Sequence, residues 1–556
     1  MTGAGADRGL PGRRGVLGAS ALTAAGTILP AGSARAAGPH PPTAPEAPRV
    51  TPADPRYGHL VSRGANRFRG TPGEVRPVES TAQVVRCVQQ AVRDGLRIAV
   101  RSGGHCFEDF VDHPRVRVLV DTARMRSVSY DPEMHAFAVE PGATLEEVYR
   151  LLHLGWGVTV PGGYCPDVGM GGHVPGGAYG PLCRLYGLLS DHLYAVETVV
   201  VDGGGRARAV VARRDPGDPA RDLWWAHTGG GGGTFGIATR YWFRSSGTTA
   251  ATPPERLLPV PPATALTFGA QWDWGALDET AFVRLCDNYG RWAERNAAPG
   301  SPAAALYAEF SLGRRSAGGG PSLFGQVTLD GPEAGRLLDG LVAAVSEGTA
   351  RPVSVTSRRM PWLTAALRGS GENAVGDFRI KVKSGYLRRR FTARQLGVLH
   401  HHLSRTDTAV YGSVTLNTYG GQVNAVRPAA TAAAQRDSVL KLLYLTAWND
   451  PADDAAHLDW IRTLYRDVYA ETGGVPAPGG DNDGAFINYP DTDLADPVLN
   501  TSGIGWQNLY FKENAAALRR VKARWDPLGV FRHTLSVPGP RTAGPGGLGR
   551  QLPDVV

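Results

Sequence analysis

Hydrophobic positions in the first half of the chain switch between a helical and a strand spacing. Ser80 precedes a run in which apolar residues recur every three or four positions, and Gly95 follows that run, so a helix is predicted between them. Thr144 and Glu147 have the spacing of a capping box at the start of a second helix. Apolar residues that alternate in twos predict short strands at 98–100, 116–120, 137–139, 158–160, 194–201, 207–212 and 237–243.

The pattern changes after five prolines in the segment 253–262. Beyond them the periodic runs are longer and predict a second domain of the α+β class with a sizeable sheet. Its predicted strands are 378–387, 408–419 and 439–448, and its predicted helices are 282–295, 333–347 and 455–472. A last helix is predicted at 506–525, where Asp526 and Pro527 end it.

The first 36 residues have the features of an export signal. Arg13 and Arg14 precede a mild apolar run, and Ala34-Arg35-Ala36 fits a cleavage site. A twin-arginine-type signal peptide at 1–36 and secretion of the protein are therefore predicted, with a disordered basic leader as the alternative. We expect a flexible linker at 37–56 and a disordered tail at 541–556.

The composition of the chain argues against several classes of function. The net charge of +8 comes from 59 basic and 51 acidic residues that are spread along the chain rather than gathered in a stripe, so no nucleic-acid partner is expected. No later run of about 18 apolar residues predicts a membrane span. The five cysteines are odd in number and include no C-x-x-C pair, which disfavours a disulfide framework and a zinc ribbon, and no metal site is predicted.

Two glycine-rich segments carry the candidate chemistry. Arg101 to His105 reads R-S-G-G-H after a predicted strand, and 162–180 reads G-G-Y-C-P-D-V-G-M-G-G-H-V-P-G-G-A-Y-G. Glycines let backbone N–H groups approach a phosphate or a flat ring closely. The alternatives are a structural histidine and a disordered linker. A third run, Gly231-x-Gly233-x-x-Gly236, fits the dinucleotide fingerprint, but a predicted strand follows it instead of a helix, so no NAD site is inferred.

The pairing of R-S-G-G-H with Y-C-P-x-V-G-x-G-G-H-x-x-G-G-x-Y-G resembles the berberine-bridge-enzyme branch of the vanillyl-alcohol-oxidase flavoproteins. In the bicovalent members of that family, this histidine is bonded to the flavin 8α carbon and this cysteine to C6. The resemblance therefore implies FAD attached covalently through His105 and Cys165. D-L-W-W-A at 222–226 and N-Y-x-D at 488–491 also match, so the likeness covers nearly the whole chain after the leader.

The resemblance implies a two-domain vanillyl-alcohol-oxidase fold of the α+β class. An FAD-binding domain is expected at 57–252, a substrate-binding domain with a large antiparallel sheet covered by helices at 253–475, and a return to the FAD-binding domain at 476–540. The implied cofactor-binding residues are Arg101, Ser102, Gly103, Gly104, His105, Cys165, Val168, Gly169, Gly171, Gly172, His173, Gly176, Gly177, Tyr179, Gly180, Asn488 and Tyr489.

The family subgroup that this chain most resembles is the bicovalent, antibiotic-tailoring oxidases. This implies oxidation of an alcohol on a sugar or a glycosylated small molecule, with O₂ reduced to H₂O₂. Tyr489 in N-Y-x-D is expected to remove the hydroxyl proton, which requires that its pKa fall from about 10. Tyr419 is expected to orient the substrate or to act as base in a second oxidation. Oxidative cyclisation of a small natural product and an exported carbohydrate-binding protein with a vestigial flavin site remain as alternatives.

Overall fold

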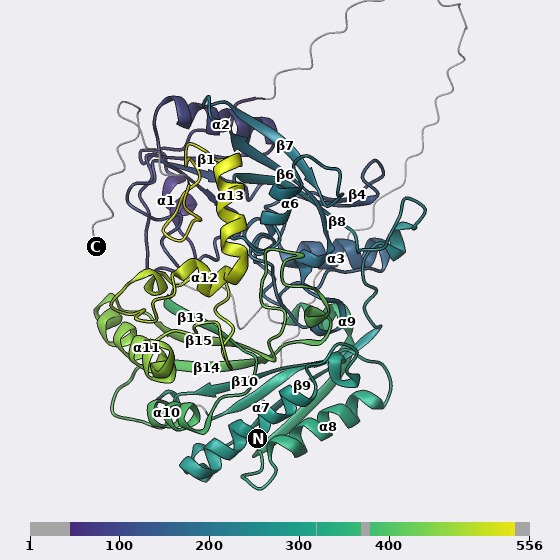
Figure 1. The fold of residues 1–556 in the computed structure, drawn as a ribbon, viewed down its shortest axis with the longest axis vertical. Coiled ribbons are helices and arrows are strands. Elements are labelled where there is room, and N and C mark those ends of the chain that lie inside the picture. Colours follow the sequence, from purple (N-terminus) through teal and green to yellow (C-terminus); the bar gives the residue numbers. More distant parts are fainter. Residues whose placement is uncertain (1–44, 319, 369–377, 540–556) are drawn as a thin grey trace, which may run out of the picture. The chain divides into compact units, whose positions relative to one another are not determined.

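A computed structural model describes residues 45–318, 320–368 and 378–539 (Figure 1). The predicted signal peptide, the start of the predicted linker and the predicted tail at 541–556 lie outside these residues. Residues 45–56, which were predicted as part of a flexible linker, are packed against the domain. The apolar side chain of Val50 is fully buried, and its backbone exchanges two hydrogen bonds with Val75, so the flexible linker does not extend through this segment.

Two sheets are built from the first half of the chain. A three-stranded parallel sheet has the order β1-β3-β2, and helix α2 (Thr81–Arg93) begins where the Ser80 side chain accepts a hydrogen bond from the Gln83 backbone. A five-stranded antiparallel sheet has the order β4-β5-β8-β6-β7. The strands are β1 (Glu74–Pro77), β2 (Ile98–Arg101), β3 (Val118–Asp121), β4 (Val128–Asp131), β5 (Ala136–Val139), β6 (Leu193–Val201), β7 (Ala207–Arg213) and β8 (Ile237–Phe243).

The helix predicted from the capping box of Thr144 and Glu147 is present in this half of the chain. In α3 (Leu145–Trp156) the Thr144 and Glu147 side chains form a complete capping box. Strand β8 starts directly after Gly236, which confirms that no helix begins at the dinucleotide-like run. The strand predicted at 158–160 is absent, because Val158 and Val160 are buried in the core without a strand partner. The shorter helices are α1 (Tyr57–Val61), α4 (Met170–His173), α5 (Cys183–Tyr186) and α6 (Arg221–Ala226).

A seven-stranded antiparallel sheet follows, with the order β12-β9-β11-β10-β14-β15-β13. This confirms the α+β class and the large sheet. Helices pack on one of its faces (Figure 1): α7 (Glu279–Arg295), α8 (Glu333–Val345), α10 (Ala393–Leu403) and α11 (Asp454–Val468). The strands are β9 (Thr264–Gln271), β10 (Leu306–Gly313), β11 (Ser322–Val327), β12 (Ser354–Pro361), β13 (Arg379–Leu387), β14 (Gly412–Thr418) and β15 (Leu440–Trp448), with α9 (Trp362–Ala366) after β12.

The end of the chain returns to the first half, where α13 (Ala515–Trp525) packs on α6. The single helix predicted at 506–525 is wrong, because α12 (Trp506–Phe511) ends at Lys512, whose φ is +50°. The Lys512 ammonium is buried and lies 2.6 Å from the Oδ1 of Asp483. That ion pair keeps the residue in a left-handed conformation that a continuous helix does not allow.

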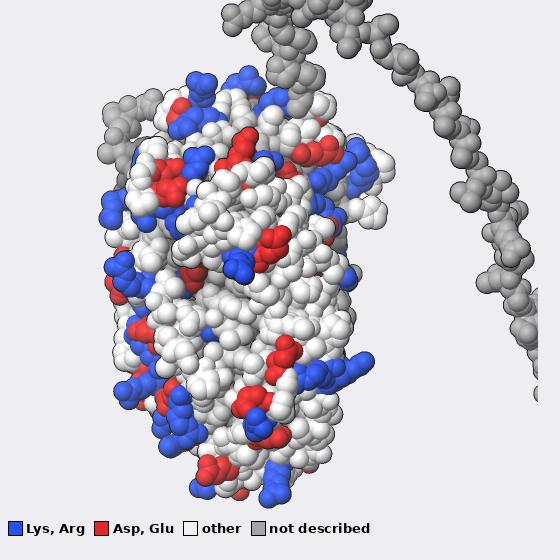
Figure 2. Space-filling view, turned by 90° about the vertical axis from the view of Figure 1, so that its right-hand side faces the viewer, with Lys and Arg blue, Asp and Glu red and all other residues white. Residues whose placement is uncertain are grey.

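The surface carries charges of both signs. On the face drawn in Figure 2, lysine and arginine side chains alternate with aspartate and glutamate, and uncharged surface fills the middle. That face has no stripe of basic residues. Within the described residues, no helix has the length and apolar character to span a bilayer, and no group of three histidine, cysteine or acidic side chains is placed to hold a metal ion.

Candidate functional site

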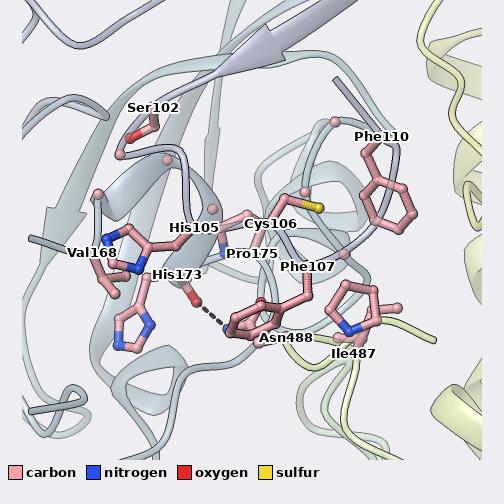
Figure 3. A pocket seen from close by; sticks show the side chains of 18 of the residues that line it. Ser102, His105, Cys106, Phe107, Phe110, Val168, His173, Pro175, Ile487 and Asn488 are labelled. Carbon is pink, nitrogen blue, oxygen red and sulfur yellow. Dashed lines mark hydrogen bonds between the residues drawn. The ribbon is translucent and has the colours of Figure 1, made fainter. Parts of the chain in front are cut away.

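A cavity of about 530 Å³ brings the two glycine-rich segments together. Its wall is formed by segments from Ala65 to His533, and Figure 3 shows some of the side chains that line it. Most of the cofactor-binding residues predicted from the sequence line it: Arg101, Ser102, Gly103, Gly104, His105, Cys165, Val168, Gly169, Gly171, Gly172, His173, Tyr179, Asn488 and Tyr489.

The loops that carry His105 and Cys165 touch through glycine backbones. A Cβ atom on Gly103 would lie 2.4 Å from the backbone nitrogen of Gly169, which is closer than any side chain allows. Ser102 anchors the first loop, because its hydroxyl donates a 2.6 Å hydrogen bond to the carbonyl of Pro141. The glycines in both motifs therefore bring two distant segments onto one wall of the cavity.

Three predicted cofactor-binding glycines have a different role. Gly176, Gly177 and Gly180 are not among the cavity-lining residues. A Cβ on Gly176 would lie 1.7 Å from Oδ1 of Asn488, and one on Gly180 would lie 1.8 Å from the carbonyl oxygen of Gly162. These positions need glycine because other parts of the chain pack directly against them, so their predicted contact with the cofactor is not supported.

Two imidazoles lie on the same side of the pocket (Figure 3). Burial lowers the pKa of His105, although Asp167 opposes this shift. Burial and the neighbouring His105 lower the pKa of His173 to about 4, and its Nε2 accepts a 3.1 Å hydrogen bond from the Gly163 backbone. Both rings are therefore neutral near pH 7, and a neutral imidazole keeps the lone pair that a nucleophile or hydrogen-bond acceptor needs.

Cys165 is held as a thiol in the protein without a bound group. Burial, with a contribution from Asp167, raises its pKa to about 11. Asn488 joins the wall from the end of the chain, because its side-chain amide donates a 3.0 Å hydrogen bond to the carbonyl of His173 (Figure 3). The N-Y-x-D segment is thereby fixed onto the loop that follows Cys165.

The lining has the chemistry that a flavin dinucleotide needs. The backbones of Gly103 and Gly172 are exposed on the cavity wall, and a Cβ on Gly172 would meet no atom within 4 Å, so a side chain there would occupy cavity space. Exposed glycine N–H groups suit a pyrophosphate. Val168 and Ile380 add apolar contacts for a flat ring system. The residues present therefore fit FAD.

The large sheet supplies residues that the sequence did not reveal. Tyr307 of β10, Asn417 of β14 and Lys441 of β15 line the cavity, and the Nζ of Lys441 lies 4.3 Å from the ring centre of Tyr489. Burial lowers the pKa of Lys441, while Glu309 opposes this shift. The pKa of Tyr489 is raised by burial, with smaller contributions from Glu309 and Cys165, which is opposite to the lowered pKa expected for a base.

Glu309 lies behind this wall and organises two of its phenols. Tyr307 and Tyr164 both donate hydrogen bonds to the Glu309 carboxylate, the second over 3.3 Å. Glu309 and Lys441 each stand as a lone charge within an apolar strand segment. Such an isolated charge in a buried strand is the sequence signal that could have indicated them.

Tyr419 does not line the cavity. It is 1% exposed, its hydroxyl donates a 3.1 Å hydrogen bond to the carbonyl of Gln435, and its ring centre lies 5.1 Å from that of Tyr179. Tyr419 therefore supports Tyr179 from behind, and its predicted role as a second base is not supported by its position.

Comparison with known proteins gives two family matches. The model described as "FAD binding domain" matches residues 72–206, and the model described as "Berberine and berberine like" matches residues 485–538. Both matched regions contribute to the cavity wall.

Individual relatives match over most of their length. An aclacinomycin-N/aclacinomycin-A oxidase of Streptomyces galilaeus is 53% identical over 88% of this chain and 90% of its own length. A hexose oxidase of Chondrus crispus is 30% identical over 87% of this chain and 94% of its own. A crystal structure of a glycopeptide hexose oxidase in complex with teicoplanin aligns with a TM-score of 0.85 and 50% identity, over 89% of this chain and 99% of that one.

Proposed function

The chain belongs to the berberine-bridge-like family of FAD-linked oxidases, and from this membership we propose that it oxidises an alcohol group of a sugar or glycosylated secondary metabolite to the carbonyl, with O₂ reduced to H₂O₂. The observation that carries the proposal is the single cavity that holds His105, Cys165 and Tyr489 together. The names of the relatives, an aclacinomycin oxidase and two hexose oxidases, support the substrate class.

We propose that His105 and Cys165 both form covalent bonds to the FAD. When bound, the FAD accepts a hydride from the substrate carbon and passes the electrons to O₂. The buried, neutral imidazole of His105 and the thiol of Cys165 stand on the same wall. His105 and Cys165 would then hold the cofactor from two loops that already touch through Gly103 and Gly169.

Tyr489 is the proposed base. Its ring faces the cavity, and its phenol oxygen can remove the hydroxyl proton of a substrate that lies against it. The ammonium of Lys441 next to the ring favours the phenolate and so offsets part of the effect of burial on the Tyr489 pKa. Asn417 and Tyr307 also line the cavity, where the Tyr307 hydroxyl bonds Glu309 and Asn417 and the Asn417 amide donates to the Lys441 carbonyl. Only the remaining N–H of Asn417 and the free lone pairs of the two side chains could bind the other hydroxyls of a sugar.

The sheet leaves room for a substrate larger than one sugar. Asn417 pairs in register with Lys441 on one side and with Glu309 on the other, and the same row continues from Glu309 through Phe324 and Gly269 to Thr356. Directly paired residues share a face of the sheet. Outside the cavity, Phe324 and Thr356 are exposed on this face of the sheet. Gln271, two residues after Gly269 on β9, is exposed on the same face. Neutral polar groups with one open aromatic ring suit a glycoside.

Acid precipitation of the purified protein tests the cofactor assignment. We expect the yellow colour to stay in the pellet for the wild type and for His105→Ala and Cys165→Ala singly, and to leave the pellet in the double variant. A colourless wild type would support a non-catalytic carbohydrate-binding protein instead. Peroxide release across a panel of hexoses, oligosaccharides and glycosylated antibiotics then identifies the substrate, and the absence of a carbonyl product would overturn alcohol oxidation.

We further propose that residues 1–36 direct twin-arginine export and that the protein is secreted. The support is the Arg13-Arg14 pair and the Ala34-Arg35-Ala36 pattern. Expression in a bacterium with this export route should release protein that begins after residue 36. Replacement of Arg13 and Arg14 by lysine should hold it in the cytoplasm, and an unchanged distribution would contradict the proposal.

A further inference from the structure

The two loops that carry the proposed chemistry both end in buried carboxylates. Glu108 follows the flavin-linking His105 by three residues, and Asp491 follows the proposed base Tyr489 by two residues. The side chains of both acids are 1% exposed. A carboxylate without solvent needs a charged partner to stay ionised.

One ammonium group supplies that partner to both acids. The Nζ of Lys381 lies 2.6 Å from Oε1 of Glu108 and 2.7 Å from Oδ1 of Asp491, and its side chain has no exposure at all. Burial alone would lower the pKa of Lys381, but Asp491, Glu108 and Asp493 raise it above its usual value. Lys383 binds the second oxygen of Asp491 at 2.8 Å but makes no ion pair with Glu108.

Strand β13 holds the loops from both of its faces. It is an edge strand of the seven-stranded sheet, and successive side chains of a strand point to opposite faces. Ile380 and Val382 line the cavity and pack with Phe107 and Tyr489, whose ring centres are 6.2 Å apart. Lys381 points the other way and holds the acids that follow these two rings.

We propose that Lys381 is a positioning residue that ties the His105 loop to the Tyr489 loop and thereby sets the distance between the flavin attachment point and the base. This inference rests on the proposed function for the roles of His105 and Tyr489. The link is the pair of contacts from one ammonium group to Glu108 and Asp491, and the Thr492 hydroxyl adds a 3.2 Å hydrogen bond to Oε2 of Glu108. Arg67 is a second cation for Glu108, at 2.9 Å, but it does not reach Asp491. Misplacement of reacting groups by about 1 Å can lower a rate by roughly 100-fold.

A residue of the same charge cluster provides a matched control. Arg462 of α11 binds Asp493 at 2.9 Å, and its side chain is 39% exposed. Asp493 in turn lies 2.8 Å from Lys383. Replacement of Arg462 therefore removes a cation from the cluster without cutting the connection between Glu108 and Asp491.

The experiment compares Lys381→Met with Arg462→Met in the full-length holoenzyme. Amide hydrogen exchange is measured by mass spectrometry over 105–112 and 486–493. We expect Lys381→Met to speed exchange in both segments by roughly tenfold or more, because two carboxylates lose their shared partner. Arg462→Met should leave 105–112 unchanged. In parallel, kcat should fall by about 100-fold in Lys381→Met with KM nearly constant, because the sugar contacts on the sheet remain.

The amount of flavin retained through His105 alone is a third measurement. In the Cys165→Ala background only His105 can hold the cofactor, so Lys381→Met should release yellow colour from the acid pellet while Arg462→Met keeps it there. The proposal is overturned if exchange rises in only one of the two loops after Lys381→Met. It is also overturned if Arg462→Met, at an equal loss in Tm, changes kcat and colour to the same extent, since that would show a general loss of stability.

If Lys381→Met does not fold, Glu108→Gln tests the proposed link between the two loops. The amide keeps the size of Glu108 and removes its charge, so exchange should rise over 105–112 while Lys383 and Lys381 still hold Asp491. Unchanged exchange at 105–112 would overturn the link. A colourless wild type would instead refute the proposed function, whereas the exchange data would still report whether Lys381 joins the two loops.

Discussion

The ammonium of Lys441 lies 4.3 Å from the centre of the Tyr489 ring, in a space where both side chains are buried from bulk water. Glu309, which hydrogen-bonds Tyr307 and Tyr164, raises the pKa of the same phenol. Glu309 is therefore a charge that opposes the phenolate of the proposed base. The Lys441 ammonium lies over the ring and favours the phenolate only while it is charged, and burial lowers its own pKa to about 8. An opposite charge within about 4–6 Å lowers the pKa of a group by roughly 1–3 units.

Opposite shifts of the pH profile follow from these two charges. Lys441→Met should raise the pKa of Tyr489, so that the midpoint of the rise in kcat with pH moves upward by about one unit or more. Glu309→Gln removes the opposing charge and should move the midpoint downward. The measurement is kcat from peroxide release at saturating substrate across pH 5–10. Shifts in the same direction for the two variants would contradict this electrostatic account.

Replacement of Tyr489 and replacement of Tyr419, the two tyrosines predicted as catalytic, should have clearly different effects on kcat. Tyr489→Phe removes the proposed base and should lower kcat by about 10²- to 10⁴-fold, the usual contribution of general base catalysis. Tyr419→Phe removes buried hydrogen bonds with the Gln435 carbonyl and the Tyr386 hydroxyl and should affect Tm more than kcat. The flavin should stay in the acid pellet for both variants. An equal loss of kcat would restore Tyr419 as a second catalytic group.

The loops that carry His105 and Cys165 are in close contact, so we expect Gly103 to tolerate no side chain. In Gly103→Ala the new Cβ would meet the Gly169 backbone at 2.4 Å, so the loops must separate, at a cost of about 1–3 kcal/mol in unfolding free energy. Less flavin should be retained in the acid pellet. Gly155→Ala is the control, because Gly155 lies in α3 with open space around it. Its Tm should rise slightly, since alanine stabilises a helix relative to glycine.

Buried neutral histidines should make the protein sensitive to acid. Burial lowers the pKa of His173 and His227 to about 4 and that of His533 to about 3, below the value of about 6.5 in an unfolded chain. The unfolded state then binds more protons below pH 6.5, so stability is present above that pH and is lost as pH falls toward 4.

Thermal unfolding between pH 7.5 and 4 checks this prediction. Each of these imidazoles accounts for roughly 3 kcal/mol at most, at about 1.4 kcal/mol per pKa unit. His227→Gln should lower Tm at pH 7 but reduce the loss of Tm on acidification. His59→Gln changes an exposed histidine and should leave the pH dependence as it is. A Tm independent of pH over this range would rule out the proposed neutral state of the three rings.

Local motifs explain how much of the site the sequence could predict. His105 and Cys165 each lie inside a continuous glycine-rich segment, so the sequence could single them out as site residues without knowledge of the fold, and both line the cavity. Lys441, Glu309 and Lys381 are single residues of strands far apart in the sequence. Their meeting depends on the strand order β10-β14-β15-β13, which the hydrophobic pattern of a single strand does not specify. The charge cluster behind β13 was therefore missed.

Elements were mispredicted where tertiary contacts overrode the local pattern. Val158 and Val160 alternate like a strand, yet the core buries them without a neighbouring strand. The helix predicted at 506–525 is interrupted by the buried ion pair of Lys512 with Asp483. In both cases the backbone conformation was set by partners distant in the chain.

The cavity wall draws on segments from Ala65 to His533, which is nearly the whole length of the described polypeptide. No fragment emerging from the ribosome can therefore contain a finished binding site, and cofactor loading has to wait until synthesis is almost complete. Under the proposed covalent attachment, folding would come first and bond formation to the cofactor second. Any passage of the loaded enzyme across a membrane requires a translocase that accepts fully folded cargo.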